Sequence, residues 1–175
     1  RARARDPRLY SLARDWERPL VVAGELAPAE MQPRRLLAAA YLEVWPALTP
    51  EKRAKVEALL RDAFLEPRTF ERLYEPWVTI AGSLDRAATL LPDQPLTWKR
   101  LATTALGRKS WSEFAALSGR SRASLRQSLE HDLALAATAV ERGDLPGARR
   151  QYSAVLAAAP VDAEFLPIVE TALGR

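Results

Sequence analysis

Residues 129–160, LEHDLALAATAVERGDLPGARRQYSAVLAAAP, decide the fold prediction for this chain. Two amphipathic stretches flank the pair Gly143-Asp144, and Pro160 closes the segment. Glycine ends helices because it adopts left-handed backbone angles, and aspartate caps the start of a following helix. Pro92 precedes Pro160 by two periods of about 34 residues, a spacing typical of stacked helix pairs. The segment therefore predicts an antiparallel pair of helices within a repeating array.

Start and stop signals divide the residues before this segment into further helices. Thr49-Pro50-Glu51 predicts a helix start, because threonine caps a helix, proline suits its first position and glutamate favours its positive end. Pro76 is predicted to break or kink the helical stretch 67–91, because proline removes a backbone donor. The pair Gly82-Ser83 predicts a second break, with Ser83 capping a helix over residues 84–91.

Two more signals stand just before the deciding segment. Ser110-Trp111-Ser112-Glu113 has the form of a capping box and predicts a short helix that ends at Gly119. Ser121 then starts a long helix over residues 122–142. These signals predict a turn between residues 119 and 121.

Length and composition set the fold class. The 175 residues suit one domain or one short repeat array, and 48% of them are hydrophobic. Runs of alternating apolar and polar residues are lacking, so we predict an all-α protein of about nine helices stacked as antiparallel pairs. The predicted organisation is a disordered basic arm over residues 1–6, an irregular helical region over 7–92 and repeats over 93–175.

Residues that carry chemistry are few. The sequence has no cysteine and one histidine, His131, so we expect no metal, no cofactor and no catalysis. The 26 Lys and Arg exceed the 22 Asp and Glu by too little to predict nucleic-acid binding. No apolar run reaches the roughly 18 residues that a membrane-spanning helix needs. Because the chain begins and ends with arginine, we interpret it as a fragment whose membrane segments would lie outside it.

The segment 129–160 resembles a tetratricopeptide repeat. With Leu129 as position one, small residues stand at positions eight and twenty, an aromatic at twenty-four and proline at thirty-two: Ala136, Ala148, Tyr152 and Pro160. Residues 95–106 are similar to a first helix of this family through Trp98, Leu101, Ala102 and Ala105. The following helix departs from the pattern, with Phe114 at the small position and Ser118 at the aromatic one. The resemblance implies a short α-solenoid that is irregular in its N-terminal half.

The resemblance also implies a binding groove on the concave face of the array. Many members of the family grip the terminal carboxylate of a partner with Lys and Asn of their first helices. Of the matching positions Lys99, Thr103, Leu133 and Ala137, only Lys99 fits that mode. We therefore expect the groove to bind a protein or peptide through a part other than its terminal carboxylate. The residues expected to line it are Lys99, Thr103, Leu133, Ala137 and Glu141.

A second resemblance concerns residues 74–102, YEPWVTIAGSLDRAATLLPDQPLTWKRLA. This run is similar to helical-repeat segments of bacterial envelope proteins associated with surface-polysaccharide assembly. It implies an alternative function, that of a soluble accessory domain of a membrane-bound protein of the O-antigen polymerase or ligase type. It favours the bacterial periplasm, or attachment to a membrane, over the cytoplasm.

Two sets of side chains are candidates for ligand contacts. The tryptophans Trp16, Trp45, Trp77, Trp98 and Trp111 could stack on a sugar or peptide, but their positions on apolar faces favour core packing. Trp111 is the best candidate for exposure. Arg120, Arg122 and Arg126 lie near the predicted helix start and could hold a phosphate or carboxylate together with free backbone N–H groups, although a solvated face is the simpler interpretation.

The end of the chain supplies the last prediction. A terminal helix without a following partner would leave Ile168, Val169, Ala172 and Leu173 uncovered. We expect contacts with a partner, with downstream sequence or with another copy to concentrate at residues 145–175 rather than at the arginine cluster. The sequence thus predicts a non-catalytic helical-repeat scaffold that binds a protein or peptide. The remainder of its own longer chain is one such partner.

Overall fold

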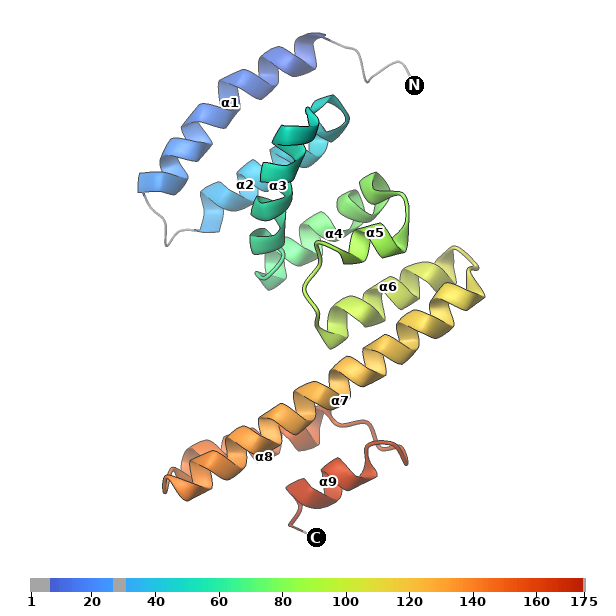
Figure 1. Ribbon diagram of the computed structural model, residues 1–175. Coiled ribbons are helices and arrows are strands. Elements are labelled where there is room, and N and C mark those ends of the chain that lie inside the picture. The colour runs from blue at the N-terminus through green and yellow to red at the C-terminus, as the bar shows by residue number, and fades with distance from the viewer. Residues whose placement is uncertain (1–6, 27–30, 175) are drawn as a thin grey trace. The chain divides into compact units, whose positions relative to one another are not determined.

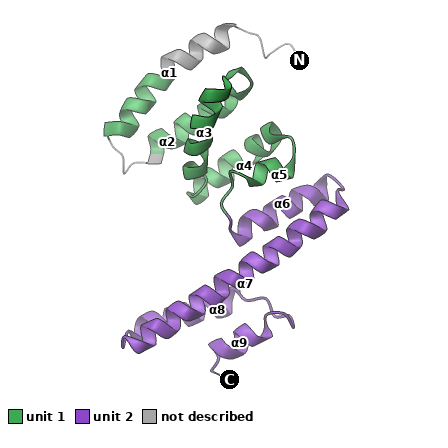
Figure 2. Ribbon diagram, in the orientation of Figure 1, with its two compact units in different colours: residues 1–92 green, residues 93–175 purple. Residues whose placement is uncertain are grey.

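The computed structural model describes residues 7–26 and 31–174, with side chains described over 17–26 and 32–174. Helices make up 81% of it and the described residues form no strand, which confirms the all-α prediction. Residues 1–6, predicted to be a basic arm, lie outside the described residues. The chain divides into two compact units, unit 1 over residues 1–92 and unit 2 over residues 93–175 (Figure 2).

Unit 1 is built around its second helix (Figure 1). Its helices are α1 (Pro7–Leu26), α2 (Met31–Glu43), α3 (Pro50–Ala63), α4 (Pro67–Ala81) and α5 (Leu84–Ala88), with a 3-10 turn at Trp45–Ala47. Helix α2 contacts α1, α3 and α4, and α4 contacts α5. Several short helices therefore share one core rather than forming separate pairs.

The predicted caps fix the helix ends in unit 1. Thr49 Oγ1 accepts a hydrogen bond from the Lys52 backbone N–H at 3.3 Å, and Ser83 Oγ accepts one from the Arg86 N–H at 3.3 Å. Gly82 ends α4 with a φ of 77°, a left-handed angle that favours glycine. Helix α5 ends at Ala88, which is shorter than the predicted span of 84–91.

Of the break or kink predicted at Pro76, the break does not occur, because α4 continues through Pro76 to Ala81. Pro76 is exposed, so solvent can satisfy the backbone carbonyl that loses its donor. The opposite face of α4 buries seven residues, namely Thr69, Phe70, Leu73, Tyr74, Trp77, Val78 and Ala81. This packing outweighs the local preference of proline for a helix end.

Aromatic side chains form much of the unit 1 core. The rings of Trp45 and Trp77 meet edge to face with centroids 5.4 Å apart, and those of Phe64 and Phe70 meet similarly at 6.2 Å. Trp77 Nε1 donates a hydrogen bond to the Ala87 carbonyl at 2.9 Å. The buried indole of Trp77 therefore keeps its polar group satisfied while it joins α4 to α5.

Unit 2 is built around one long helix (Figure 1). Its helices are α6 (Pro95–Gly107), α7 (Trp111–Glu141), α8 (Leu145–Ala158) and α9 (Leu166–Ala172), and α7 contacts the other three. Helix α6 runs along the first half of α7, and α8 runs along its second half. The Ser121 hydroxyl donates to the Pro95 carbonyl at 3.2 Å, which places the start of α6 near the middle of α7.

The predicted turn after Gly119 is wrong. Residues 111–141 form one helix of 31 residues. Gly119 lies inside it without the positive φ of Gly82 and Gly143. A glycine inside a helix costs only about 1 kcal/mol relative to alanine, so neighbouring packing can override it. Leu117 before the glycine and Leu129 after it are both buried, and they anchor the helix on either side.

The capping box predicted at Ser110 is also not formed. Ser110 does precede α7, but among the described residues its side chain makes no capping hydrogen bond. The predicted cap at Asp144 is present, because its side chain accepts from the Gly147 N–H at 2.9 Å. Gly147 leaves the room for this contact, since an added Cβ would lie 2.0 Å from Asp144 Oδ2.

The unit 2 core lies where α7, α8 and α9 meet. Its buried residues are Leu129, Val155, Ala159, Phe165 and Ile168, with Leu125, Leu133, Val169 and Ala172 packed around them. Ala136, toward the end of α7, and Ala148, near the start of α8, are also buried. Small side chains at these positions let the two helices approach closely.

Candidate binding surfaces

The structure does not bring the five predicted groove residues together. Lys99 and Thr103 are exposed on α6, whereas Ala137 and Glu141 are exposed on the second half of α7. Ser121, which contacts the start of α6, lies about 24 Å along α7 from Ala137 at 1.5 Å per residue. Leu133 packs against the unit 2 core instead of facing solvent. A single groove through all five would have required the turn that α7 does not make.

The predicted contact face on the last helix is largely covered within unit 2. Ile168 is 4% exposed and belongs to the core, and Val169 and Ala172 pack against that core. Leu173 alone of the four is well exposed, at 50%. This face is covered rather than exposed because the buried Phe165 anchors the start of α9 against α7 and α8.

The three arginines of the predicted anion site have separate partners. The Arg120 guanidinium lies 5.2 Å from the centre of the Trp98 ring, an arrangement that favours a cation–π contact. Arg122 pairs with Glu164 at 3.8 Å, and Arg126 pairs with Glu130 on the same helix at 3.0 Å. The site also required the free N–H groups of a helix start, and these residues lie inside α7.

The tryptophans divide between core and surface. Trp45 and Trp77 are buried, Trp98 is half-buried, and the Trp16 side chain lies outside the described side chains. Trp111 is 66% exposed. A pocket of about 300 Å³ opens beside Trp98 and is lined by Asp93, Trp98, Arg120, Ala123, Ser124 and Gln127. Trp98 Nε1 donates to Asp93 there, so this indole has its polar partner within unit 2.

A shallow, open hollow lies along the exposed face of α8. It has a volume of about 600 Å³ and is lined by Leu145, Pro146, Arg149, Arg150 and Ser153. All five are exposed, and Leu145 is 63% exposed. We call this surface the α8 face. It combines apolar side chains with two arginines that form no ion pair within the described residues.

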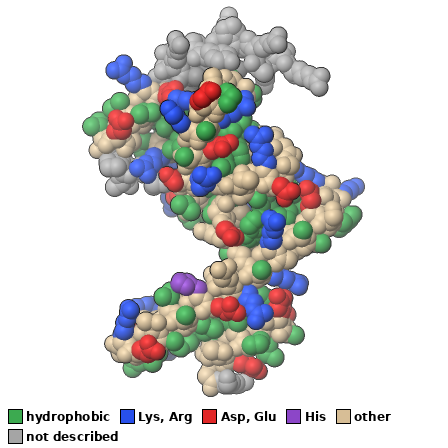
Figure 3. All heavy atoms as spheres, in the orientation of Figure 1, with side chains coloured by type: hydrophobic (Ala, Val, Ile, Leu, Met, Phe, Trp, Pro, Cys, Tyr) green, Lys and Arg blue, Asp and Glu red, His purple; other side chains and the backbone are tan. Residues whose placement is uncertain are grey.

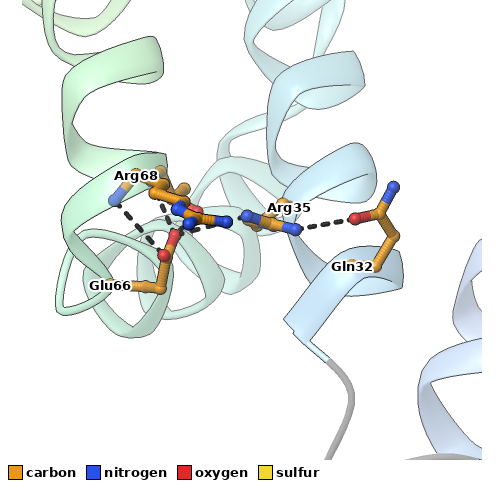
Figure 4. A network of polar contacts seen from close by, with 5 residues as sticks. Gln32, Arg35, Glu66 and Arg68 are labelled. Atoms are coloured by element: carbon orange, nitrogen blue, oxygen red, sulfur yellow. Dashed lines mark hydrogen bonds and ion pairs between the residues drawn. The ribbon is translucent and has the colours of Figure 1, made fainter.

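A smaller pocket lies between α2 and α4 in unit 1. It has a volume of about 110 Å³ and is lined by Gln32, Arg35, Leu36, Arg68, Thr69, Arg72 and Leu73. We call it the arginine pocket. Arg35 and Gln32 come from α2, and Arg68 and Arg72 come from the first two turns of α4. In Figure 4 the side chains of Arg35 and Arg68 point toward one another across the two helices.

Glu66 organises the polar contacts beside the arginine pocket. It precedes α4 and accepts from the N–H groups of Arg68 at 3.2 Å and Thr69 at 2.6 Å, and from the Thr69 hydroxyl (Figure 4). These hydrogen bonds, chiefly those from Thr69, and the Arg35 charge lower the pKa of the Glu66 carboxyl. Glu66 is therefore a fixed anion that occupies the first N–H groups of α4.

Arg35 is held in place between two partners. Its Nη2 donates to Gln32 Oε1 at 2.6 Å, and its Nη1 lies 3.6 Å from Glu66 Oε2. Arg68 and Arg72 are exposed, and their guanidinium groups have no hydrogen-bond or ion-pair partner in the described part of the chain. The pocket thus has one fixed guanidinium and two that are available to a ligand.

Sequence reasoning missed this pocket because its residues come from two distant segments. The spacing of Arg68 and Arg72 places them on one face of a helix, and this was the available signal. Arg35 joins them only because α2 packs against α4, a contact that the pattern of apolar residues does not predict.

The remaining chemistry of the described residues is limited. His131 is exposed on α7. No group of three or more His, Cys, Asp or Glu side chains is placed to hold a metal ion in the described part. Among the described helices, none is long and apolar enough to cross a membrane. On the face shown in Figure 3, basic and acidic side chains are interspersed.

No family model, curated protein or solved structure matches this chain. The interpretation of the two binding surfaces therefore rests on their geometry and charge.

Proposed function

We propose that this protein is a non-catalytic helical interaction module whose α8 face binds a segment of a protein partner. The observation that supports this proposal is the α8 face itself, where exposed Leu145 lies beside Arg149 and Arg150. Leu156, which is 37% exposed, lies three residues after Ser153 and continues the same face by one turn of α8. A partner segment that carries apolar residues flanked by Asp or Glu complements this arrangement.

Both contact types contribute to such binding. An apolar contact removes leucine surface from water, at about 25 cal/mol per Å². The guanidinium groups of Arg149 and Arg150 can each form paired hydrogen bonds with a carboxylate. Acidic residues in the partner also select against basic competitors through charge.

The proposed scaffold is TPR-like over its last third only. The second half of α7 and α8 take the places of a first and second helix, with Ala136 and Ala148 at the close contact. Helix α9 then takes the place of the next first helix, because it packs against both α7 and α8. The fusion of the first helix into α7 sets this unit apart from a regular array. Service as an accessory domain in polysaccharide assembly stays a sequence-based prediction.

The test uses two labelled peptides of equal length, one of leucine and glutamate and one of leucine and lysine. Fluorescence anisotropy should show that the protein binds the acidic peptide at least tenfold more tightly. The double variant Arg149→Glu with Arg150→Glu should reverse this preference. Both arginines are exposed, so the folded state should persist, as judged by circular dichroism.

A matched control makes the same change of charge elsewhere. Lys55→Glu with Arg61→Glu alters two exposed residues of α3 and should leave the affinity for the acidic peptide within about twofold. Equal losses in the two double variants would show that only net charge matters. Equal binding of the two peptides by the unmodified protein would also refute the proposal.

A further inference from the structure

The arginine pocket gathers more positive charges than negative ones. Arg35, Arg68 and Arg72 place three guanidinium groups around one opening of about 110 Å³. Glu66 supplies one carboxylate beside them, and it lies 3.6 Å from Arg35. The balance is three positive charges and one negative, which leaves a net charge of two. Like charges repel at short range, so an anion of two charges would neutralise the pocket.

The size of the pocket restricts what can enter. The pocket has a volume of about 110 Å³ and is open to solvent. A small anionic group, such as a phosphoryl or carboxylate, is the part of a ligand that fits between the guanidinium groups. A ligand would therefore enter with its anionic end first and leave its remaining atoms outside, beside Leu36, which is 40% exposed.

The available donors favour a phosphoryl group over a carboxylate. A phosphate monoester carries a charge of about −1.5 to −2 near neutral pH and offers three acceptor oxygens, whereas a carboxylate carries one charge and two oxygens. Arginine pairs with phosphate through two parallel hydrogen bonds. Arg68 and Arg72, on adjacent turns of α4, can supply such pairs, and Arg35 can share its charge from α2.

We propose that the arginine pocket binds the phosphoryl group of a soluble phosphate monoester, with Arg68 and Arg72 as direct ligands. Arg35 faces the same group and is positioned by Gln32 and Glu66. The first N–H groups of α4 are not part of the site, because Glu66 already accepts their hydrogen bonds. This site lies in unit 1 and is independent of the proposed function of the α8 face in unit 2.

The experiment titrates the protein with phenyl phosphate and follows the arginine Nε–Hε signals by NMR. Benzoate is the matched carboxylate, since it presents the same ring. We expect saturable shifts of Arg35, Arg68 and Arg72 with phenyl phosphate and an affinity for benzoate at least tenfold weaker. Equal affinities for the two ligands would overturn the proposal.

Variants separate the pocket from general charge effects. Arg68→Gln with Arg72→Gln should weaken phenyl phosphate binding at least tenfold, whereas Arg61→Gln with Arg86→Gln, two other exposed arginines of unit 1, should leave it within about twofold. Equal weakening in both pairs would refute a specific site. If the first pair fails to fold, the Arg35 signal of the unmodified protein still decides the question. Binding to phosphatidic acid vesicles without any response to phenyl phosphate would also overturn the proposal.

Discussion

Unit 1 and unit 2 bury different kinds of side chain. The unit 1 core includes the large rings of Trp45, Phe64, Phe70, Tyr74 and Trp77. Among its described residues, unit 2 buries one aromatic side chain, Phe165, and its other buried hydrophobic side chains are alanine, valine, leucine and isoleucine. The comparison teaches that two all-helical units of one chain can depend on opposite kinds of packing.

The difference extends to where helices end. In unit 1, side-chain caps start α3, α4 and α5, and Gly82 ends α4, so that short helices pack around the rings. In unit 2, small side chains let α8 lie close along α7, and α7 passes through its predicted stop at Gly119. Unit 1 should therefore be most sensitive to the loss of a large side chain, and unit 2 to the gain of one.

Loss of a ring should have the largest effect on unit 1. Trp77→Ala removes a side chain that is 1% exposed, together with its indole hydrogen bond to the Ala87 carbonyl, so we expect a loss of about 3–5 kcal/mol in the free energy of unfolding. Urea denaturation measures this value. The control is Trp111→Ala, which should cost less than about 0.5 kcal/mol because Trp111 is 66% exposed. Similar losses for the two variants would contradict the described core.

Gain of a side chain should have a smaller but clear effect on unit 2. Ala148→Leu inserts three carbon atoms where alanine is 3% exposed, and we expect a loss of about 1–3 kcal/mol. Ala157→Leu makes the same change at an exposed position of α8 and should be nearly neutral. If Ala148→Leu unfolds at the same urea concentration as the parent, the α7–α8 contact is not close at Ala148.

Gly119, inside α7, and Gly143, just after its end, should respond oppositely to alanine. Gly143 ends the helix with a φ of 77°, so Gly143→Ala should destabilise by about 1–2 kcal/mol. Gly119 lies within the helix, and an added Cβ would meet nothing within 4 Å, so Gly119→Ala should stabilise by about 0.5–1 kcal/mol. Thermal unfolding measures both. Destabilisation by Gly119→Ala would indicate a turn at that residue.

The smallest predicted effect is a pH dependence of unit 1. Burial alone would raise the pKa of Glu17, but hydrogen bonds from Lys52 and Tyr41 and the Lys52 charge lower it below 4.5. Because the folded pKa is the lower one, this stabilisation is present above pH 4.5 and is lost as the pH falls through the folded pKa. Both side chains are partly solvated, so we expect at most about 1 kcal/mol.

The test of this dependence compares two lysine variants across the acid range. Lys52→Met should flatten the decline of unfolding free energy between about pH 5 and pH 3, because it removes the partner that lowers the pKa. Lys55→Met, at an exposed position of the same helix, should keep the parent's decline. Identical acid profiles for all three proteins would show that the Glu17–Lys52 pair does not form in solution.

Local signals allowed most helix ends to be predicted from the sequence. The caps at Thr49, Ser83 and Asp144 depend on residues within three positions, so their side chains and spacing contain the necessary information. The continuity of α7 could not be predicted in this way. It depends on packing of Leu117 and Leu129 against other helices, which outweighs the weak local cost of Gly119.

The candidate sites were harder to predict than the fold. The predicted groove and anion site both assumed a helix boundary near residue 120, and both lost their geometry when α7 proved continuous. The arginine pocket needs the contact of α2 with α4, which brings Arg35 to Arg68 and Arg72. Long-range packing therefore decides which charged residues meet.

The continuity of α7 is the central claim, and a distance between spin labels tests it most directly. The chain has no cysteine, so Ser112→Cys with Ala134→Cys places two labels at exposed positions on either side of Gly119. Double electron–electron resonance should give a narrow distribution near 33 Å, at about 1.5 Å per residue. A helix pair that turned back at Gly119 would leave the labels offset by about 12 Å along the axes and about 16 Å apart, given an interaxial distance of about 10 Å. A dominant population at the short distance would contradict the continuous helix.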